Sequence, residues 1–230
     1  MVSERMLALG TSRSVIRELF EYGKQRAAVV GKENVFDFSI GNPSVPAPPE
    51  VNQTAIRLLQ EENSTILHGY TSAQGDPGVR KAIADNLNRR YGTCYTGTEL
   101  YMTVGASAAL CCCFNALTTP GGNEYIVFAP YFPEYKVFIE GAGGTMKVVQ
   151  AHPDTLQIDA QALAEAITPQ TKGVVINSPN NPSGVIYTGE TLKAVAAVLE
   201  EKSAQYGHPI FLISDEPYRE IAFQIGRAHV

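Results

Sequence analysis

The sequence predicts an α/β fold, in which a largely parallel sheet carries helices on both faces and a helical N-terminal piece belongs to a smaller domain. The first observation is that strand-like apolar runs alternate with amphipathic segments after residue 76, which implies right-handed crossovers between parallel strands. The second is a proline-rich passage, residues 41–50, between this region and an N-terminal helix. The third is length, because 230 residues can bury a substantial core.

The N-terminal region is predicted to be helical. Apolar residues recur along one helical face, and the pattern ends near Gly31. These residues are Val15, Ile16, Leu19 and Phe20. A short extended run follows at 34–40, and four prolines in residues 41–50 are expected to exclude helix and sheet. We therefore place the crossing between domains here, with predicted domains 1–45 and 46–224.

The remaining elements alternate in type. Asp76 and Gly92 are expected to cap the two ends of a helix that has Pro77 at its first position. Asp159 and Thr188 are the expected N-caps of two later helices. Five runs are predicted strands: 99–105, 124–130, 145–151, 173–179 and 210–216. Four segments are predicted helices between them: 106–117, 132–142, 159–167 and 188–207.

Composition excludes several classes of function. The chain is 44% hydrophobic and 18% charged, with a formal net charge of -5, which argues against nucleic acid and acidic membrane surfaces as partners. The N-terminus predicts neither a signal peptide nor a membrane anchor. Three of the four cysteines are consecutive and point in different directions on a helix, so no metal site is predicted. We expect these cysteines, at 94 and 111–113, to be buried thiols of a cytoplasmic protein.

Open α/β sheets bind ligands beyond the carboxyl ends of their strands, so candidate residues are sought there. The first such corner is the string TVGASAAL, in which a strand ends at Gly105 and a helix begins with Ala106 and Ser107. Small residues let the backbone approach an anion, and the free N–H groups and dipole of a helix N-terminus favour negative charge. The alternative is a plain packing turn, since such turns are common.

Two further corners carry an aromatic ring and an amide. In APYFPEY, an aromatic residue at a strand end could stack on a planar ring, and ordinary core packing is the alternative. In NSPNNPSG, Asn181 follows an apolar strand and could hold a polar ligand atom. The same string also satisfies the chemistry of a tight turn.

The fourth corner, SDEPYRE, places a carboxylate at the mouth of a buried strand. Ionisation of Asp215 is costly there unless a cation accompanies it, and a protonated pyridine nitrogen is such a cation. Tyr218 could donate a hydrogen bond to a phenolate on the same ring. The alternative is that Asp215 only caps the next turn.

In this order, the four strings resemble class I/II aminotransferases of fold type I, which depend on pyridoxal 5′-phosphate. The likeness extends over nearly the whole chain to about Phe223. It implies that Ala106 and Ser107 bind the cofactor phosphate. It also implies that Phe132, rather than Tyr131, stacks on the pyridine ring.

The same resemblance implies catalytic roles for Asp215 and Tyr218. Asp215 would pair with the pyridinium nitrogen, and Asn181 and Tyr218 would hold the ring O3′. In HGYTSAQGDPGVR, Tyr70 would reach the phosphate of the neighbouring subunit of a homodimer. In SIGNPS, Gly41 would line the site for the substrate carboxylate.

The resemblance further implies amino-group transfer between an L-amino acid, with aspartate preferred, and a 2-oxo acid. The family's Schiff-base lysine would lie beyond Phe223, and no lysine follows Lys202, so we expect a truncated large domain without transaminase activity. Run 99–105 is expected to lack its neighbouring strands. Residues 225–230 are expected to be a non-native tail.

The sequence leaves other functions open. A carbon–sulfur β-lyase or a cyclopropane-forming synthase would use the same fold. A non-enzymatic alternative is the aminotransferase-like sensor domain of a transcription regulator, which would carry a basic winged-helix domain in front. A nucleotide-binding domain is less favoured, because neither G-x-G-x-x-G nor G-x-x-x-x-G-K-[ST] occurs.

Overall fold

The computed structural model describes residues 2–11, 15–39, 41, 45–120 and 122–221. The chain divides into two compact units, Met1–Thr71 and Ser72–Val230. This division lies later in the chain than the predicted crossing at residue 45. The assignment of 1–45 and 46–224 to two domains of the whole protein stays a prediction, and the predicted tail at 225–230 lies outside the described residues.

The first unit is helical. Its elements are α1 (Glu4–Thr11), α2 (Val15–Val30), the 3-10 helix η1 (Lys32–Asn34), α3 (Pro49–Glu61) and α4 (Ser64–Leu67). The predicted N-terminal helix is present as α2 and ends before Gly31, as expected. The expectation that residues 41–50 exclude helix was wrong, because α3 begins at Pro49. Proline suits the first turn, where the missing N–H would have no helical partner.

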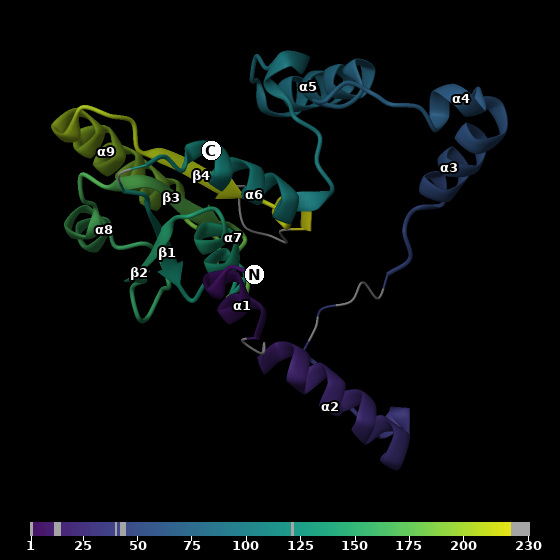
Figure 1. Ribbon diagram of the computed structural model, residues 1–230, viewed down its shortest axis with the longest axis horizontal. Coiled ribbons are helices and arrows are strands. Elements are labelled where there is room, and N and C mark those ends of the chain that lie inside the picture. Colours follow the sequence, from purple (N-terminus) through teal and green to yellow (C-terminus); the bar gives the residue numbers. More distant parts are fainter. Residues whose placement is uncertain (1, 12–14, 40, 42–44, 121, 222–230) are drawn as a thin grey trace. The chain divides into compact units, whose positions relative to one another are not determined.

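The second unit contains a four-stranded parallel sheet (Figure 1). Its strands are β1 (Glu124–Ala129), β2 (Thr145–Gln150), β3 (Thr171–Asn177) and β4 (Phe211–Asp215). They lie in the order β2-β1-β3-β4. From β1 the chain passes to β2 at one edge of the sheet, and from β3 it passes to β4 at the opposite edge. The carboxyl ends of β1 and β3 therefore meet at a topological switch point, where sheets of this kind bind ligands.

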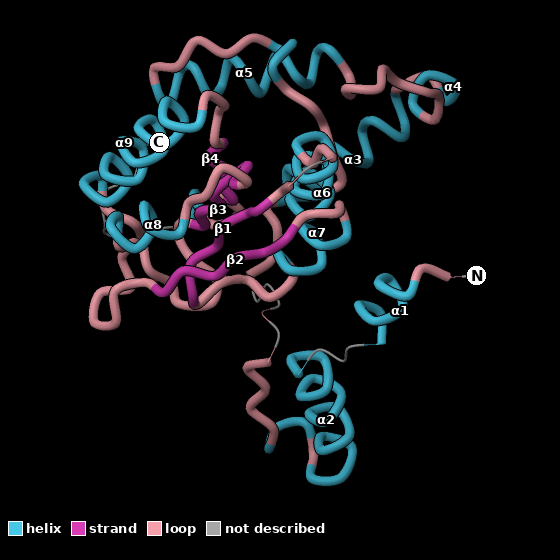
Figure 2. Tube along the Cα trace, turned by 60° about the vertical axis from the view of Figure 1, so that its left-hand side comes forward, coloured by secondary structure: helices cyan, strands magenta, loops and turns pink. Residues whose placement is uncertain are grey.

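Helices cover both faces of the sheet, which confirms the predicted fold class (Figure 2). The helices of this unit are α5 (Pro77–Tyr91), α6 (Gly105–Leu117), α7 (Tyr135–Gly141), α8 (Ala160–Ala166) and α9 (Gly189–Tyr206). Two 3-10 helices, η2 (Gly97–Glu99) and η3 (Arg219–Ile221), complete it. Side chains of α6 and α7 pack on one face of the sheet, and those of α8 and α9 pack on the other.

The two faces are filled by alternate residues of the same strands. In β1, Tyr125 and Val127 pack in the cluster beneath α6 and α7, whereas Ile126 and Phe128 pack in the cluster beneath α8 and α9. All four side chains are buried. Such burial on both faces is typical of parallel sheets.

The predicted strand at 99–105 was wrong. The structure gives a 3-10 helix up to Glu99, irregular backbone after it and helix α6 from Gly105. A strand needs a neighbouring backbone to complete its hydrogen bonds, and none of the four strands in the described sheet pairs with this segment. Instead, the backbone N–H of Met102 donates to the carbonyl of Gln74 at 3.0 Å.

The prediction of buried cysteines was also wrong. Cys94, Cys112 and Cys113 are exposed, Cys111 is half-buried, and all four are free thiols. The reason for the three on α6 is geometric, because the helix buries only the stripe that includes Leu110 and Phe114. Within the described residues there is no group of His, Cys, Asp or Glu that could hold a metal ion, and no helix long and apolar enough to span a membrane.

The predicted helix caps are present. Asp76 accepts from the N–H of Val79, and Thr188 accepts from that of Thr191. Asp159 accepts from two N–H groups at the start of α8, at 2.9 and 3.1 Å. Side-chain caps of this kind satisfy donors that have no partner within the helix.

Replacing the α8 cap tests this account. We expect Asp159→Ala to lower the free energy of unfolding by about 1 kcal/mol, because two N–H groups lose their acceptor. Urea denaturation monitored by circular dichroism measures the change. The control is Asp154→Ala, an exposed aspartate nearby, which should stay within about 0.5 kcal/mol of the wild type. Equal stability of both variants would contradict the capping role.

Candidate functional site

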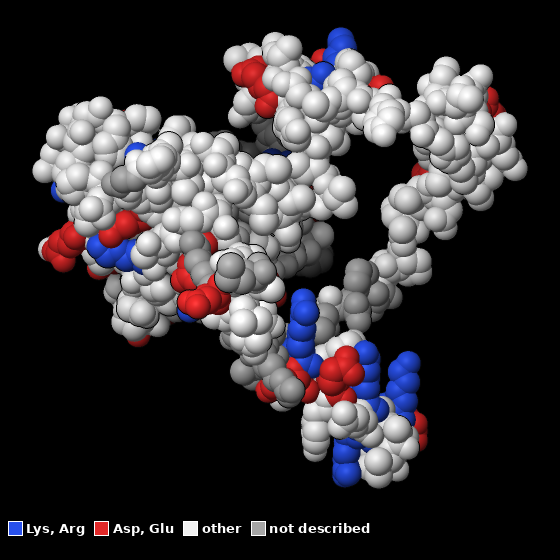
Figure 3. Space-filling model, in the orientation of Figure 1, with Lys and Arg blue, Asp and Glu red and all other residues white. Residues whose placement is uncertain are grey.

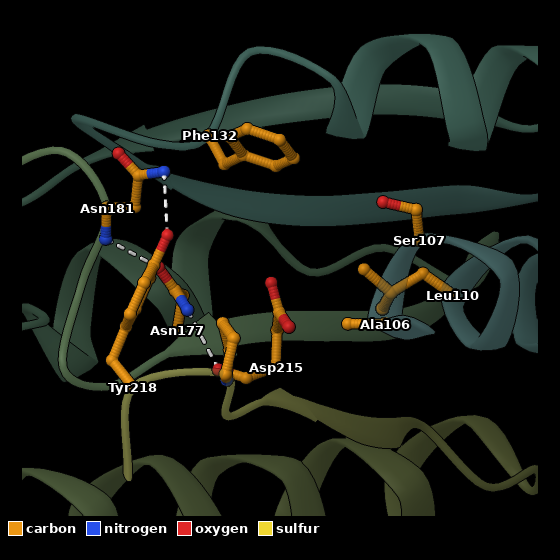
Figure 4. Close-up of a pocket in the computed structure, with 9 residues that line it drawn as sticks. Ala106, Ser107, Leu110, Phe132, Asn177, Asn181, Asp215 and Tyr218 are labelled. Carbon is orange, nitrogen blue, oxygen red and sulfur yellow. Dashed lines mark hydrogen bonds between the residues drawn. The ribbon is translucent and has the colours of Figure 1, made fainter. Parts of the chain in front are cut away.

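A pocket lies at the carboxyl ends of β1, β3 and β4 (Figure 4). Its volume of about 170 Å³ is roughly ten times what one water molecule needs, so the pocket is large enough for a ligand. It is lined by Ala106, Ser107, Leu110, Phe132, Asn177, Asn181, Asp215, Pro217 and Tyr218. Six residues predicted from strand ends therefore lie around one cavity, although they span more than a hundred positions of the sequence.

One wall of the pocket is the N-terminus of α6. Gly105 opens this helix with a φ of 81°, a conformation that favours glycine, and Ala106 and Ser107 follow in the first turn. The N-cap, Val104, provides no side-chain hydrogen bond, and the first turn carries no acidic residue. The N–H groups of this turn, together with the Ser107 hydroxyl, are thus suited to an incoming anion.

The second wall follows β1. Tyr131 and Phe132 both pack against the core cluster beneath α6 and α7, but only Phe132 also lines the pocket. The predicted helix spans 132–142, but α7 begins at Tyr135 with Glu134 as its N-cap. The N–H of Tyr135 donates to the carbonyl of Phe132 at 3.1 Å, so residues before the helix form a turn that presents the Phe132 ring.

The third wall is the asparagine turn after β3. Asn180 is buried, and its side-chain oxygen accepts from the N–H and hydroxyl of Ser183 at 3.1 and 2.8 Å. Asn181 faces the pocket, and its Nδ2 donates to the Tyr218 hydroxyl at 3.3 Å. The sequence left two alternatives for this string, a tight turn and a ligand-facing amide. In the structure Asn180 stabilises the turn, and Asn181 faces the pocket.

Asn177, the last residue of β3, was missed by sequence reasoning. Its Oδ1 accepts from the backbone N–H of Asn181 at 2.6 Å, and its Nδ2 donates to the backbone carbonyl of Asp215 at 2.8 Å. It therefore ties the loop after β3 to the end of β4. The available signal was a polar residue that ends an otherwise apolar strand.

The floor of the pocket is a buried carboxylate. Asp215, the last residue of β4, is only 8% exposed, and its side chain points into the pocket (Figure 4). Burial raises the pKa of Asp215, a hydrogen bond from Tyr135 opposes this rise, and the charge of Glu216 adds to it. Of the ion pairs among the described residues, none involves Asp215. A buried carboxylate without a cation is a site suited to a cationic ligand group.

Two predicted site residues belong to the first unit. Gly41 and Tyr70 are both exposed, and neither is among the residues that line the pocket. Their predicted roles, at the substrate carboxylate and at the phosphate of a neighbouring subunit, stay predictions.

Surface charge is mixed. Over the sheet-containing unit, acidic and basic side chains are interspersed on the face that Figure 3 shows. Several charged residues of this unit form ion pairs within the chain, including Lys81 with Asp85 at 2.6 Å and Arg219 with Glu216 at 2.9 Å. An exposed pair such as Lys81 with Asp85 contributes little to stability.

The fold and the pocket together define a parallel-sheet α/β protein whose pocket combines a helix N-terminus, an aromatic ring and a buried carboxylate. The sequence pattern of the family described as aminotransferase class I and II matches residues 33–229. The chain belongs to this family, whose members use pyridoxal 5′-phosphate.

Individual relatives agree with this assignment. The crystal structure of an aminotransferase from Eubacterium rectale is 56% identical, with a TM-score of 0.95, over 99% of this chain and 57% of its own. An aspartate/prephenate aminotransferase of Thermus thermophilus is 35% identical over 80% of this chain and 45% of its own. An aspartate aminotransferase from Thermus thermophilus, solved with maleate, superposes with a TM-score of 0.84 at 29% identity, over 100% of this chain and 56% of its own. The chain thus spans about half the length of these relatives.

Proposed function

We propose that the whole protein is an aminotransferase that moves an amino group between an L-amino acid and a 2-oxo acid. The observation that carries the proposal is the Asp215 carboxylate, which is buried and has no ion-pair partner among the described residues, in the same pocket as the N-terminus of α6. A ligand with a phosphate and a protonated ring nitrogen satisfies both features at once.

The residues present fit pyridoxal 5′-phosphate. Ala106 and Ser107 would hold its phosphate at the helix N-terminus, and the ring of Phe132 would cover a face of the pyridine. Asn181 and Tyr218, which already share a hydrogen bond, would hold the ring oxygen O3′. Each group of the cofactor thereby has a partner of matching chemistry in the pocket.

When bound, the cofactor supplies an electron sink for bonds at the substrate Cα. Asp215 keeps the proton on the ring nitrogen, because its negative charge stabilises the cationic form of the ring. Asn181 and Tyr218 fix the orientation of the ring by holding O3′. Phe132 excludes water from the ring face, which strengthens the charge pairing at Asp215.

For the substrate we propose a dicarboxylic amino acid such as aspartate. Support comes from relatives named aspartate aminotransferases and from the relative solved with maleate, a dicarboxylate. We further propose a cytoplasmic homodimer, in which Gly41 lines the substrate carboxylate site and Tyr70 reaches the phosphate in the partner subunit. The exposed free cysteines are compatible with a reducing compartment.

The direct test uses the complete gene product with added pyridoxal 5′-phosphate. We expect amino-group transfer from L-aspartate to 2-oxoglutarate, followed by the appearance of oxaloacetate and glutamate. L-alanine and L-phenylalanine serve as comparison donors and report the substrate preference. Formation of pyruvate and ammonia from cystathionine, without amino transfer, would overturn the proposal in favour of a carbon–sulfur β-lyase.

The chain of residues 1–230 gives a second test. None of the described residues that line the pocket is a lysine. We therefore expect this chain to bind the cofactor without a covalent bond and to show no turnover, because a nucleophilic amine is lacking at the ring. Borohydride treatment followed by mass spectrometry checks this. A stoichiometric adduct at one specific lysine, together with turnover, would contradict the expectation.

A further inference from the structure

Tyr135 contacts two of the pocket residues but does not itself line the pocket. It is the first residue of α7 and only 2% exposed. Its hydroxyl donates to Oδ2 of Asp215 at 2.6 Å. Its ring meets the ring of Phe132 edge to face, with centroids 5.6 Å apart and an interplanar angle of 84°. One buried side chain thus links the floor of the pocket to one of its walls.

We propose that Tyr135 is a positioning residue that orients both the Asp215 carboxylate and the Phe132 ring toward the cofactor. This inference rests on the proposed function. The torsion of a carboxyl group about its last bond is broad, so an aspartate with no fixed partner would present either oxygen at many angles. The short hydrogen bond engages Oδ2, and leaves Oδ1 for the ring nitrogen.

The chemical nature of the partner matters as much as its geometry. A lysine or arginine in this place would neutralise Asp215 and compete with the cationic ring. A phenol stabilises the carboxylate without adding charge. Burial raises the pKa of Tyr135, and the bond to Asp215 raises it further, so the hydroxyl keeps its proton and remains the donor. The Tyr135 hydroxyl therefore brings no charge of its own to Asp215, and its hydrogen bond opposes the rise in the Asp215 pKa that burial causes.

The contact with Phe132 adds a second function. Edge-to-face aromatic pairs have a preferred geometry that restricts both rings. Phe132 lies in a turn before α7, where the backbone alone leaves its side chain several rotamers. Packing against Tyr135 limits this freedom, so that the ring is held in place before the cofactor arrives.

The chain offers a closely matched control in Tyr125. This tyrosine is also buried in the cluster beneath α6 and α7, and its ring lies edge to face with Phe114 at 5.0 Å and 79°. Its hydroxyl is hydrogen-bonded to Thr118 at 3.0 Å, and it is not among the residues that line the pocket. Tyr125→Phe therefore removes the same atom from a similar environment without touching the site.

The test compares binding of pyridoxal 5′-phosphate with binding of its analogue in which a C–H group replaces the ring nitrogen. Affinities are measured by equilibrium dialysis on the complete gene product and on its Tyr135→Phe and Tyr125→Phe variants. We expect Tyr135→Phe to weaken binding of the natural cofactor roughly ten-fold or more, because a hydrogen bond to a charged group is lost. Binding of the analogue should be unchanged, and Tyr125→Phe should change neither affinity.

The ratio of the two affinities is independent of the fraction of protein that is folded, so reduced stability of a variant cannot produce the effect. The pH profile is a second readout. Since the Tyr135 hydrogen bond lowers the pKa of Asp215, its loss should shift the acid limit of cofactor binding to higher pH. Equal weakening of both ligands by Tyr135→Phe, or no weakening of either, would overturn the inference. Failure of the wild-type protein to bind the natural cofactor would instead overturn the proposed function.

Discussion

Asp215→Asn is expected to lower the affinity for pyridoxal 5′-phosphate by about two to three orders of magnitude. The amide keeps the volume of the side chain and can still accept the hydrogen bond from Tyr135, so the shape of the pocket is retained. It lacks the negative charge that would pair with the ring nitrogen, and removing one partner of a buried charge pair costs about 3–5 kcal/mol. Each 1.4 kcal/mol corresponds to a tenfold change in affinity. Equilibrium dialysis with the complete gene product measures the loss.

The matched control for this substitution is Glu216→Gln. It removes the same charge one residue further along the chain, where the side chain bonds with Arg219 and Ser214 outside the pocket. Affinity for the cofactor should change less than threefold. If Glu216→Gln weakened binding as much as Asp215→Asn, the effect would come from the overall charge of the region and not from a specific pair.

Asp215→Asn should stabilise the folded protein when the cofactor is absent, although it weakens binding of the cofactor. Burial raises the pKa of Asp215 above its ordinary value. Ionising the carboxyl therefore costs more in the folded than in the unfolded chain, and this penalty is present above the raised pKa and disappears as the pH falls through it. Asp215→Asn should thus raise the melting temperature of the cofactor-free protein at pH 7, and the gain should diminish at acidic pH. A lower melting temperature at pH 7 would contradict this account.

Phe114→Ala is expected to lower the free energy of unfolding by about 3–5 kcal/mol, which is the largest stability effect we predict. Phe114 is completely buried and lies edge to face against Tyr125 of β1. It belongs to the stripe that holds α6 on the sheet, so its truncation leaves a cavity that the rigid strands cannot fill. Urea denaturation at a fixed protein concentration measures the change.

Cys113→Ala, at the adjacent position of the same helix, is the control for this prediction. Its side chain is exposed, and alanine is a good helix former, so stability should stay within about 0.5 kcal/mol of the wild type. A loss at Cys113 as large as that at Phe114 would show that this face of α6 is covered in solution.

Much of the sheet could be predicted because its signals are local. The apolar runs of β1 to β4 and the caps Asp76, Asp159 and Thr188 each depend on a few neighbouring residues. The segment 99–105 has a similar pattern but forms no strand, because a strand needs a second backbone to pair with, and the neighbouring strands that this segment was expected to lack are absent from the described sheet. The prediction that the three cysteines on α6 are buried was wrong for a related reason. A generally apolar helix gives little indication of which stripe faces the core.

Most residues of the pocket could also be predicted from the sequence. The rule that ligands bind beyond strand ends placed Phe132, Asn181 and Asp215 at one site. Tyr135 could not be recognised from its distance to a strand end, because its position in the sequence is typical of a core residue of an amphipathic helix. Its relation to Asp215 crosses 80 positions of the sequence and exists only once β1 and β4 lie in the same sheet.

The strand order also has a consequence for synthesis of the protein on the ribosome. The pocket begins at Ala106 and is completed by Tyr218, and β3 separates β1 from β4 in the sheet. Because synthesis proceeds at about 5–20 residues per second, roughly 6–22 seconds separate the emergence of the phosphate-facing turn from that of Tyr218. During this interval β1 and β3 can already pair, whereas the cofactor has no buried carboxylate to bind. We therefore expect pyridoxal 5′-phosphate to stabilise chiefly a chain whose fourth strand has already docked, because Asp215 and Tyr218 reach the pocket only then.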